Sequence, residues 1–110
     1  MGVGRSKSVE VMTSIDLDGA NSTSAYAAPD MSNIYVQVVY ESAAGSPVVT
    51  LYTSGDKTNW DTVAGYVSSA LSAAGSFSWQ LKEFSAPYYR VTVTSSGTAG
   101  TAVVTFNGNR

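Results

Sequence analysis

Apolar and polar residues alternate along a series of short segments between Asn33 and Asn107. The segment Asn33 to Tyr40 shows this most clearly, because every second residue from Ile34 onward is large and apolar or aromatic. A period of two is typical of a β-strand with one buried face, and we expect this strand to be central. Gly45-Ser46-Pro47 supplies turn residues before Val48 to Thr53, so the two segments are predicted to form a hairpin.

Other segments of the chain have the same strand-like composition. They are Ser8 to Leu17, Trp60 to Val67, Ser76 to Leu81, Tyr88 to Thr94 and Thr101 to Asn107. The stretches at 18–30 and 68–75 are rich in small and turn-forming residues and are predicted to be loops. About seven strands at this spacing predict an all-β fold, a single antiparallel β-sandwich that is immunoglobulin-like or jelly-roll-like.

Strand parity predicts which side chains face the core, because successive residues of a strand point to opposite sides of the sheet. In the first predicted strand, Val9, Val11 and Ile15 share one face. In the later strands the inward set is Ile34, Val36, Val38, Val49, Leu51, Trp60, Phe77, Trp79, Leu81, Tyr89, Val91, Val93, Val104 and Phe106. Replacing Trp79 by alanine is expected to destabilise the protein by about 3 to 5 kcal/mol.

Composition and charge narrow the classes of partner. The chain has 110 residues, 13% of them charged, with a net charge of −2. Six scattered Lys and Arg residues give no basic stripe for nucleic acid. No apolar run is long enough for a membrane span, and the start lacks the apolar region of a secretory signal. We expect a flexible N-terminal arm at 1–8 and one sandwich domain at 9–110. The first six residues also fit the N-myristoylation pattern, but a plain flexible arm is favoured over lipidation.

Conventional catalytic and metal-binding chemistry has little support, because the sequence contains no histidine and no cysteine. Asp56 and Asp61 could form a glycosidase-type acid pair, but both lie among turn residues, where aspartate commonly bonds its own backbone. Asp16, Asp18 and Asn21 resemble a calcium loop without its ligand register, so a surface turn is favoured over an ion site. We therefore expect no enzymatic activity, no cofactor and no metal.

Aromatic residues with polar tips offer a further interpretation. Tyr52, Trp60, Tyr66 and Tyr88 could form a platform on which sugar rings stack. The favoured interpretation is structural, with Trp60 closing one end of the sandwich and the tyrosines forming cross-strand pairs.

The segment Ser54-Gly55-Asp56-Lys57-Thr58-Asn59-Trp60 resembles the S-x-D-G-x-x-W turn of small β-sandwich proteins from tailed-phage virions. Strands of those proteins also end in Y-x-R-V-x-V, followed by a Gly-rich turn and a last T-x-V-x-V-type strand. The matching segments here are Tyr88 to Val93, Ser96 to Gly100 and Thr101 to Phe106. Lys57 stands where glycine is common. An Asp-box hairpin of sialidases fits less well, because Thr58 replaces its glycine and Trp60 comes one residue early.

The resemblance implies a capsid-decorating or tail-associated virion module without catalytic residues. We expect a homo-oligomer whose partners are capsid or tail proteins of the same virion, with no nucleic acid and no membrane partner. The residues expected to bind these partners are Arg5, Lys7, Tyr52, Tyr88 and Arg90. The alternative hypothesis is a carbohydrate-binding module that uses Tyr52, Trp60, Tyr66 and Tyr88.

Overall fold

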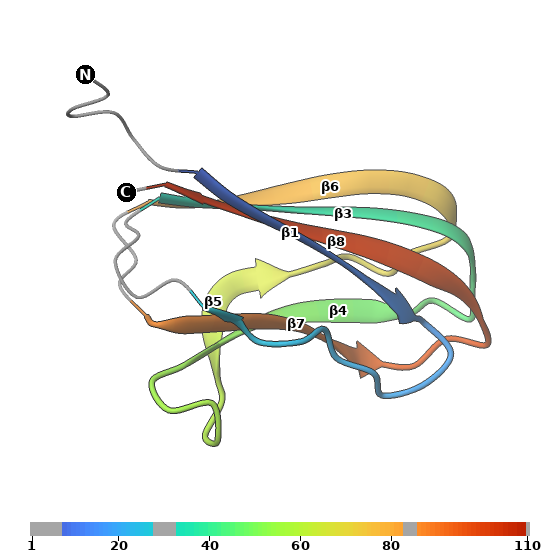
Figure 1. Cartoon of the computed structure of the whole chain (residues 1–110). Coiled ribbons are helices and arrows are strands. Elements are labelled where there is room, and N and C mark those ends of the chain that lie inside the picture. The colour runs from blue at the N-terminus through green and yellow to red at the C-terminus, as the bar shows by residue number, and fades with distance from the viewer. Residues whose placement is uncertain (1–7, 28–32, 83–85, 110) are drawn as a thin grey trace.

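The computed structural model describes residues 8–27, 33–82 and 86–109. Two four-stranded sheets pack face to face as a sandwich (Figure 1). The first sheet contains, in spatial order, β1 (Ser8–Asp16), β8 (Ala99–Asn109), β3 (Asn33–Ala44) and β6 (Ala73–Lys82). The second contains β2 (Tyr26–Ala27), β7 (Tyr88–Ser95), β4 (Val48–Ser54) and β5 (Asp61–Val67). The described residues include no helix that could cross a membrane.

The strand order identifies the jelly-roll form of the predicted sandwich. The first strand pairs with the eighth, the second with the seventh, the third with the sixth and the fourth with the fifth, all antiparallel. A long antiparallel ribbon rolled over itself produces this order. Among the connections between described strands, only that from β4 to β5 joins neighbours of one sheet. The predicted antiparallel β-sandwich is therefore confirmed, with β3 in a central position.

The predicted hairpin between the third and fourth strands is wrong, because β3 and β4 lie in different sheets. The end of β3 carries a bulge at Ser42, which has φ 56°, and the turn that follows contains Gly45 at φ 81°. This corner packs against the corner between β7 and β8, where the Thr98 N–H donates to the Ala44 carbonyl at 2.8 Å. Turn residues thus ended the strand as predicted, but the bulge and the corner contacts send the chain to the opposite sheet.

The two predicted loops contain more structure than their composition indicates. Tyr26 and Ala27 form the short strand β2, and Ser22 makes an isolated bridge with Thr92. β6 begins at Ala73, inside the second predicted loop, and Leu71 just before it is buried. These segments lack a period of two, so their pairing depends on strands that are distant in sequence.

The core lies between the sheets and contains most of the predicted inward set. Buried members are Ile34, Val36, Val38, Val49, Leu51, Leu81, Tyr89, Val91, Val93, Val104 and Phe106. Ile15 is also buried, whereas the side chains of Val9 and Val11 lie outside what the structure describes. Phe77 and Trp79 point inward but are only partly buried, because they lie on the edge strand β6.

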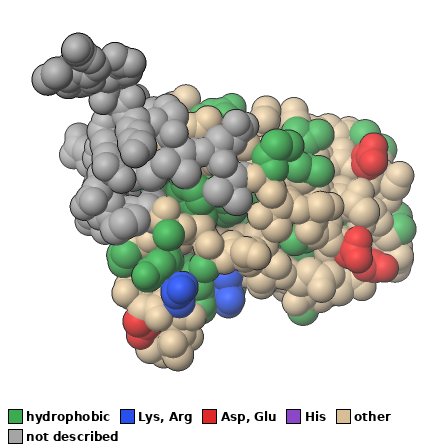
Figure 2. Space-filling view, in the orientation of Figure 1, with side chains coloured by type: hydrophobic (Ala, Val, Ile, Leu, Met, Phe, Trp, Pro, Cys, Tyr) green, Lys and Arg blue, Asp and Glu red, His purple; other side chains and the backbone are tan. Residues whose placement is uncertain are grey.

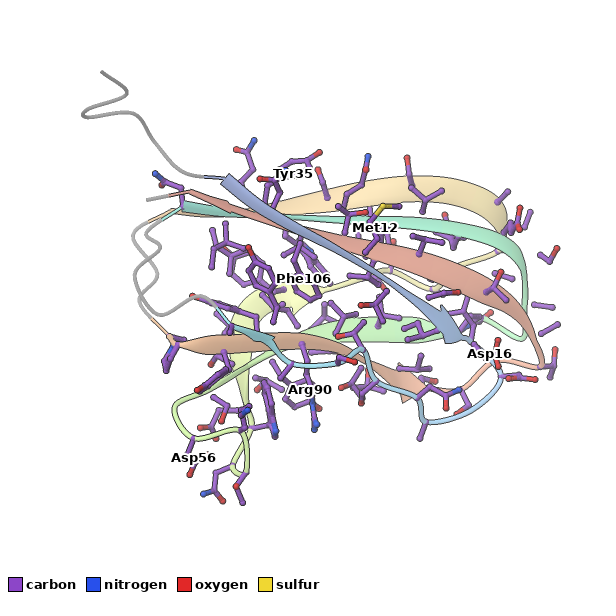
Figure 3. All side chains as sticks on the ribbon, viewed as in Figure 1. Met12, Asp16, Tyr35, Asp56, Arg90 and Phe106 are labelled. Atoms are coloured by element: carbon purple, nitrogen blue, oxygen red, sulfur yellow. The ribbon has the colours of Figure 1, made fainter. Side chains whose placement is uncertain are left out.

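Two aromatic residues correct the predicted core. Tyr26, from a predicted loop, is buried and stacks on Phe106 with ring centroids 5.0 Å apart and an interplanar angle of 10°. Figure 3 shows Phe106 between the two sheets. Trp60 is not part of the core, because its ring lies against Arg90 on the outer side of the second sheet.

Candidate functional site

The turn between β4 and β5 is held by two side chains that bond to its backbone. The Ser54 hydroxyl accepts hydrogen bonds from the N–H groups of Asp56, at 3.1 Å, and Lys57, at 2.9 Å. One carboxylate oxygen of Asp56 accepts from the N–H groups of Thr58 and Asn59, both at 2.9 Å, and the other accepts from the Asn59 amide at 2.9 Å. Led by the Asn59 backbone N–H, these bonds hold the pKa of Asp56 well below its usual range. Asp56 therefore acts as an ionised clamp of the turn.

Lys57 adopts a left-handed backbone conformation inside this turn, with φ 66°. Glycine takes that conformation without steric penalty, whereas a residue with a Cβ atom does not. The Trp60 indole N–H donates to the Lys57 carbonyl at 3.2 Å. The turn therefore fixes the relative positions of Lys57 and Trp60.

Strand β7 supplies the side chains that meet this turn. Tyr89 and Val91 point into the core, so Tyr88 and Arg90 point outward from the second sheet. Tyr52 of β4 pairs with Arg90 across the sheet and shares its outward parity. Residues far apart in sequence therefore meet on one exposed surface.

We call this surface the cation–aromatic face; its residues are Tyr52, Lys57, Trp60, Tyr88 and Arg90. The guanidinium carbon of Arg90 lies 4.3 Å from the Trp60 ring centroid and 5.9 Å from that of Tyr52. The Lys57 ammonium nitrogen lies 5.3 Å from the Tyr88 ring centroid. These distances are within the range of cation–π attraction. Figure 2 shows basic side chains on this part of the molecule, and Figure 3 shows Arg90 and Asp56 on the outer side of the second sheet.

A set of hydroxyl groups continues the same outer surface. Thr50 and Thr94 hydrogen-bond to each other at 2.8 Å between their hydroxyl oxygens. The hydroxyls of Ser22 and Thr92 form a similar bond at 2.9 Å. These pairs hold short side chains close to the sheet; Thr50 is itself buried, whereas Ser22 and Thr94 are exposed.

The structure separates the residues expected to bind partners. Tyr52, Tyr88 and Arg90 lie together on the cation–aromatic face. Arg5 and Lys7 lie outside the described residues. The structure therefore places three of these residues on one surface and leaves the contribution of the N-terminal segment as a prediction.

The proposed sugar platform is only partly assembled. Tyr52, Trp60 and Tyr88 share the cation–aromatic face, but Tyr66 points inward and packs against the core. The Tyr66 ring meets Trp79 edge to face, with centroids 6.2 Å apart. Tyr66 therefore contributes to the contact between the sheets at the β5 and β6 edges and not to a platform with the other three residues.

The acidic residues considered for chemistry occupy surface positions. Asp56 is engaged by the turn, and Asp61 is exposed at the first position of β5. In the candidate ion loop, the Asn21 amide donates to the Asp16 backbone carbonyl at 3.0 Å and so uses its nitrogen rather than its oxygen. No group of three or more possible metal-ligating side chains occurs within the described ranges.

Lys57 belongs to neither set of binding residues that the sequence pattern predicts. The available signal was the presence of a lysine where the similar turn has glycine. A non-glycine residue at positive φ is uncommon, and such residues cluster at functional sites.

No protein-family model matches this sequence, and no curated protein matches it. Its fold is similar to that of several solved structures. One is the SPBc2 prophage-derived protein YomS, with a TM-score of 0.58, 11% identity, and coverage of 93% of this chain and 96% of YomS. Another is the PBSX exported protein XepA, with a TM-score of 0.71 and 14% identity, where 98% of this chain aligns with 39% of XepA. This chain thus spans well under half of XepA.

A third similar structure is a family 29 carbohydrate-binding module from Piromyces equi. Its TM-score is 0.58 at 6% identity, and the alignment covers 94% of this chain and 91% of the module. At these identities the comparisons show a common fold. Phage-derived proteins and a carbohydrate-binding module are both among the proteins that share it.

Proposed function

We propose that this chain is a non-enzymatic structural protein of a phage virion. It attaches to a capsid or tail assembly through protein–protein contacts and acts as a homo-oligomer. The observation that carries the proposal is the cation–aromatic face, where Tyr, Trp and Arg side chains gather on the outer side of a rigid sheet. These residue types dominate the binding energy of protein interfaces. The phage-derived proteins with the same fold support a virion setting.

The rigidity of the face favours binding to a partner surface. Its side chains come from β4, β7 and the clamped turn between β4 and β5, so little conformational entropy remains to be lost on association. Arg90 is already held by two rings, which reduces the ordering cost of its long side chain.

The N-terminal residues supply a second proposed contact. Arg5 and Lys7 carry positive charge on a segment that we predict to be an arm, and such a tether would raise the effective concentration of the sandwich at its partner. A chain without residues 1–7 should keep the melting temperature of the full-length protein and show lower occupancy in particles.

The test is incorporation into particles of the phage whose genome encodes the chain. Purified particles should contain the wild-type protein at a fixed ratio to the major capsid or tail protein, and Tyr52→Ala and Arg90→Ala should lower that ratio at equal expression. Met12→Ala is the matched control, because Met12 is 65% exposed and belongs to β1 of the other sheet. Absence of the wild-type protein from purified particles would contradict the proposal.

Carbohydrate binding is the second candidate function. The observation that favours it is the common exposed surface of Tyr52, Trp60 and Tyr88, on a fold that a carbohydrate-binding module shares. A glycan array with the purified protein distinguishes the two candidates. Specific binding of a neutral glycan that is lost in Trp60→Ala would favour this second function.

A further inference from the structure

The two cationic side chains that the structure describes, Lys57 and Arg90, lie on the same face, although the chain as a whole has a net charge of −2. Neither forms an ion pair with a carboxylate among the described residues. Each instead lies against aromatic rings. Two positive charges are therefore held in position, with their capacity for carboxylate binding unused by the described part of the chain.

Arg90 has unused hydrogen-bonding capacity. Its Nε atom is buried and has no acceptor within the described residues. Its guanidinium plane lies close to the Trp60 ring, and the Tyr52 ring lies farther away. A guanidinium can bind a carboxylate through two parallel N–H···O bonds, and because Nε is buried, both bonds to an incoming carboxylate would come from the two terminal nitrogen groups.

The same geometry argues against stacking of a neutral sugar as the main mode of binding. A sugar ring needs an open aromatic face, but Arg90 covers one side of Trp60, and the Lys57 ammonium lies near the Tyr88 ring. The groups that remain to contact a ligand are cations supported by rings. They favour a negatively charged ligand.

Lys57 occurs at a backbone position where glycine would be more stable. Its φ of 66° is unfavourable for a residue with a Cβ atom, and the side chain crosses to the Tyr88 ring. Backbone strain of this kind is found where function requires a particular side chain. If binding at this face requires the ammonium group, the presence of lysine at this strained position is accounted for.

The acidic groups near this face form no ion pair with its two cations within the described residues. The Asp56 carboxylate is engaged by the turn's own N–H and amide groups, and Asp61 forms no ion pair with either cation. Two other described acids, Asp16 and Glu41, both pair with Thr101 on the first sheet. In Figure 2, one acidic side chain lies beside the basic ones at the lower left, and the other visible acidic side chains lie at the opposite end of the molecule.

We propose that the cation–aromatic face is a binding site for carboxylate groups on an acidic segment of a partner protein. Arg90 binds one carboxylate through two N–H···O bonds, and Lys57 attracts a neighbouring carboxylate as a point charge. Tyr52, Trp60 and Tyr88 hold the cations in place. This inference rests on the proposed function as a protein-binding module and adds the chemistry of the partner.

The experiment measures binding of the full-length protein to hexaglutamate, with both ends blocked, by calorimetry at low salt. Hexaglutamine and oligogalacturonate of matched length are the comparison ligands. Hexaglutamate should bind, more weakly as salt rises, and hexaglutamine should not. Arg90→Gln should weaken hexaglutamate binding about tenfold, and Arg90→Lys should restore only part of the loss, because lysine cannot form the paired bonds.

Two controls separate binding from folding and from net charge. Lys57→Gly should weaken hexaglutamate binding without lowering the melting temperature. Ser46→Gly is its control, because Ser46 also has positive φ, at 57°, and lies in the corner between β3 and β4. Arg110→Gln removes the same charge as Arg90→Gln at the last residue of the chain and should leave the affinity unchanged.

Three outcomes would overturn the inference. They are no saturable binding of hexaglutamate, equal binding of hexaglutamine, and binding of oligogalacturonate at least tenfold tighter than hexaglutamate, which would identify an acidic saccharide site. Particle occupancy tests the proposed function separately. If Arg90→Ala lowers occupancy but hexaglutamate does not bind, attachment through this face stands and the carboxylate chemistry is wrong.

Discussion

The Arg90 guanidinium lies 4.3 Å from the centre of the Trp60 ring, on the outer side of the second sheet. The two residues are distant in sequence, and alternation alone placed Trp60 in the core. The clamped turn after β4 instead carries its ring across the outer surface to β7. The same contact removes Trp60 from the core and creates the candidate binding face.

The two tryptophans should differ in their effect on stability. Trp79→Ala removes an inward side chain that is only partly buried, so we expect a loss of about 2 to 4 kcal/mol, below the full range for a core aromatic. Trp60→Ala removes an outer contact with Arg90 and should cost about 1 kcal/mol. Denaturant unfolding measures both. An equal or larger loss for Trp60→Ala would contradict its placement outside the core.

Replacement of Lys57 by glycine should separate stability from binding. Glycine relieves the left-handed strain but loses the contact with Tyr88 and adds freedom to the unfolded chain, so unfolding free energy should stay constant or rise by up to about 1 kcal/mol. Hexaglutamate affinity should fall. A clear loss of stability in thermal unfolding would show that the lysine side chain has a structural role in the turn.

The turn should tolerate acid unusually well. The hydrogen bonds to Asp56 lower the pKa of its carboxyl group in the folded protein. The contribution of the ionised carboxylate to stability is therefore fully present above the unfolded pKa of about 3.9 and is lost only as pH falls through the lower folded pKa. In a Trp79→Phe background, Trp60 fluorescence should therefore stay constant from neutral pH to below pH ~4. Asp56→Ala should change that fluorescence already at neutral pH. A transition centred at the ordinary carboxyl pKa would contradict the clamp.

Two buried tyrosines should make the protein sensitive to alkali. Burial raises the pKa of Tyr89, and it raises that of Tyr26 against a smaller opposing effect of a hydrogen bond from the Gly108 backbone. As pH rises, these tyrosines lose their protons at lower pH in the unfolded chain than in the folded protein. Their contribution to the free energy of unfolding should therefore be fully present below pH ~10 and decline as pH rises through the folded pKa values. Urea unfolding between neutral pH and pH ~11 measures the decline. Tyr26→Phe should reduce its slope, and an unchanged slope would exclude Tyr26 as a source.

The close contact between the β3–β4 corner and the β7–β8 corner should require glycine at position 97. A Cβ atom there would collide with the Ala44 carbonyl oxygen and lie 2.8 Å from the Pro47 ring, and these are groups that cannot rotate away. Gly97→Ala should destabilise the protein by about 1 to 3 kcal/mol. Gly55→Ala is the matched control, because nothing lies within 4 Å of its added Cβ atom. Equal melting temperatures for the two variants would contradict the corner packing.

The sequence by itself determined which residues of β3, β4, β7 and β8 face the core. The parity of Ile34, Val36 and Val38 was predicted correctly, because alternation is a local property that depends only on the pleat of the strand. Leu51 and Val91 followed the same rule in the second sheet. The jelly-roll was one of two forms that this pattern allowed.

Only the tertiary structure decided which strands pair and which side chains meet. Local turn signals could not show that β3 and β4 belong to different sheets, because the corner is stabilised by contacts with the distant β7–β8 connection. Burial of Tyr26 and Leu71 likewise requires partners far away in the chain. The meeting of Lys57 with Tyr88 depends on a backbone conformation and on strand pairing, neither of which residue type alone determines.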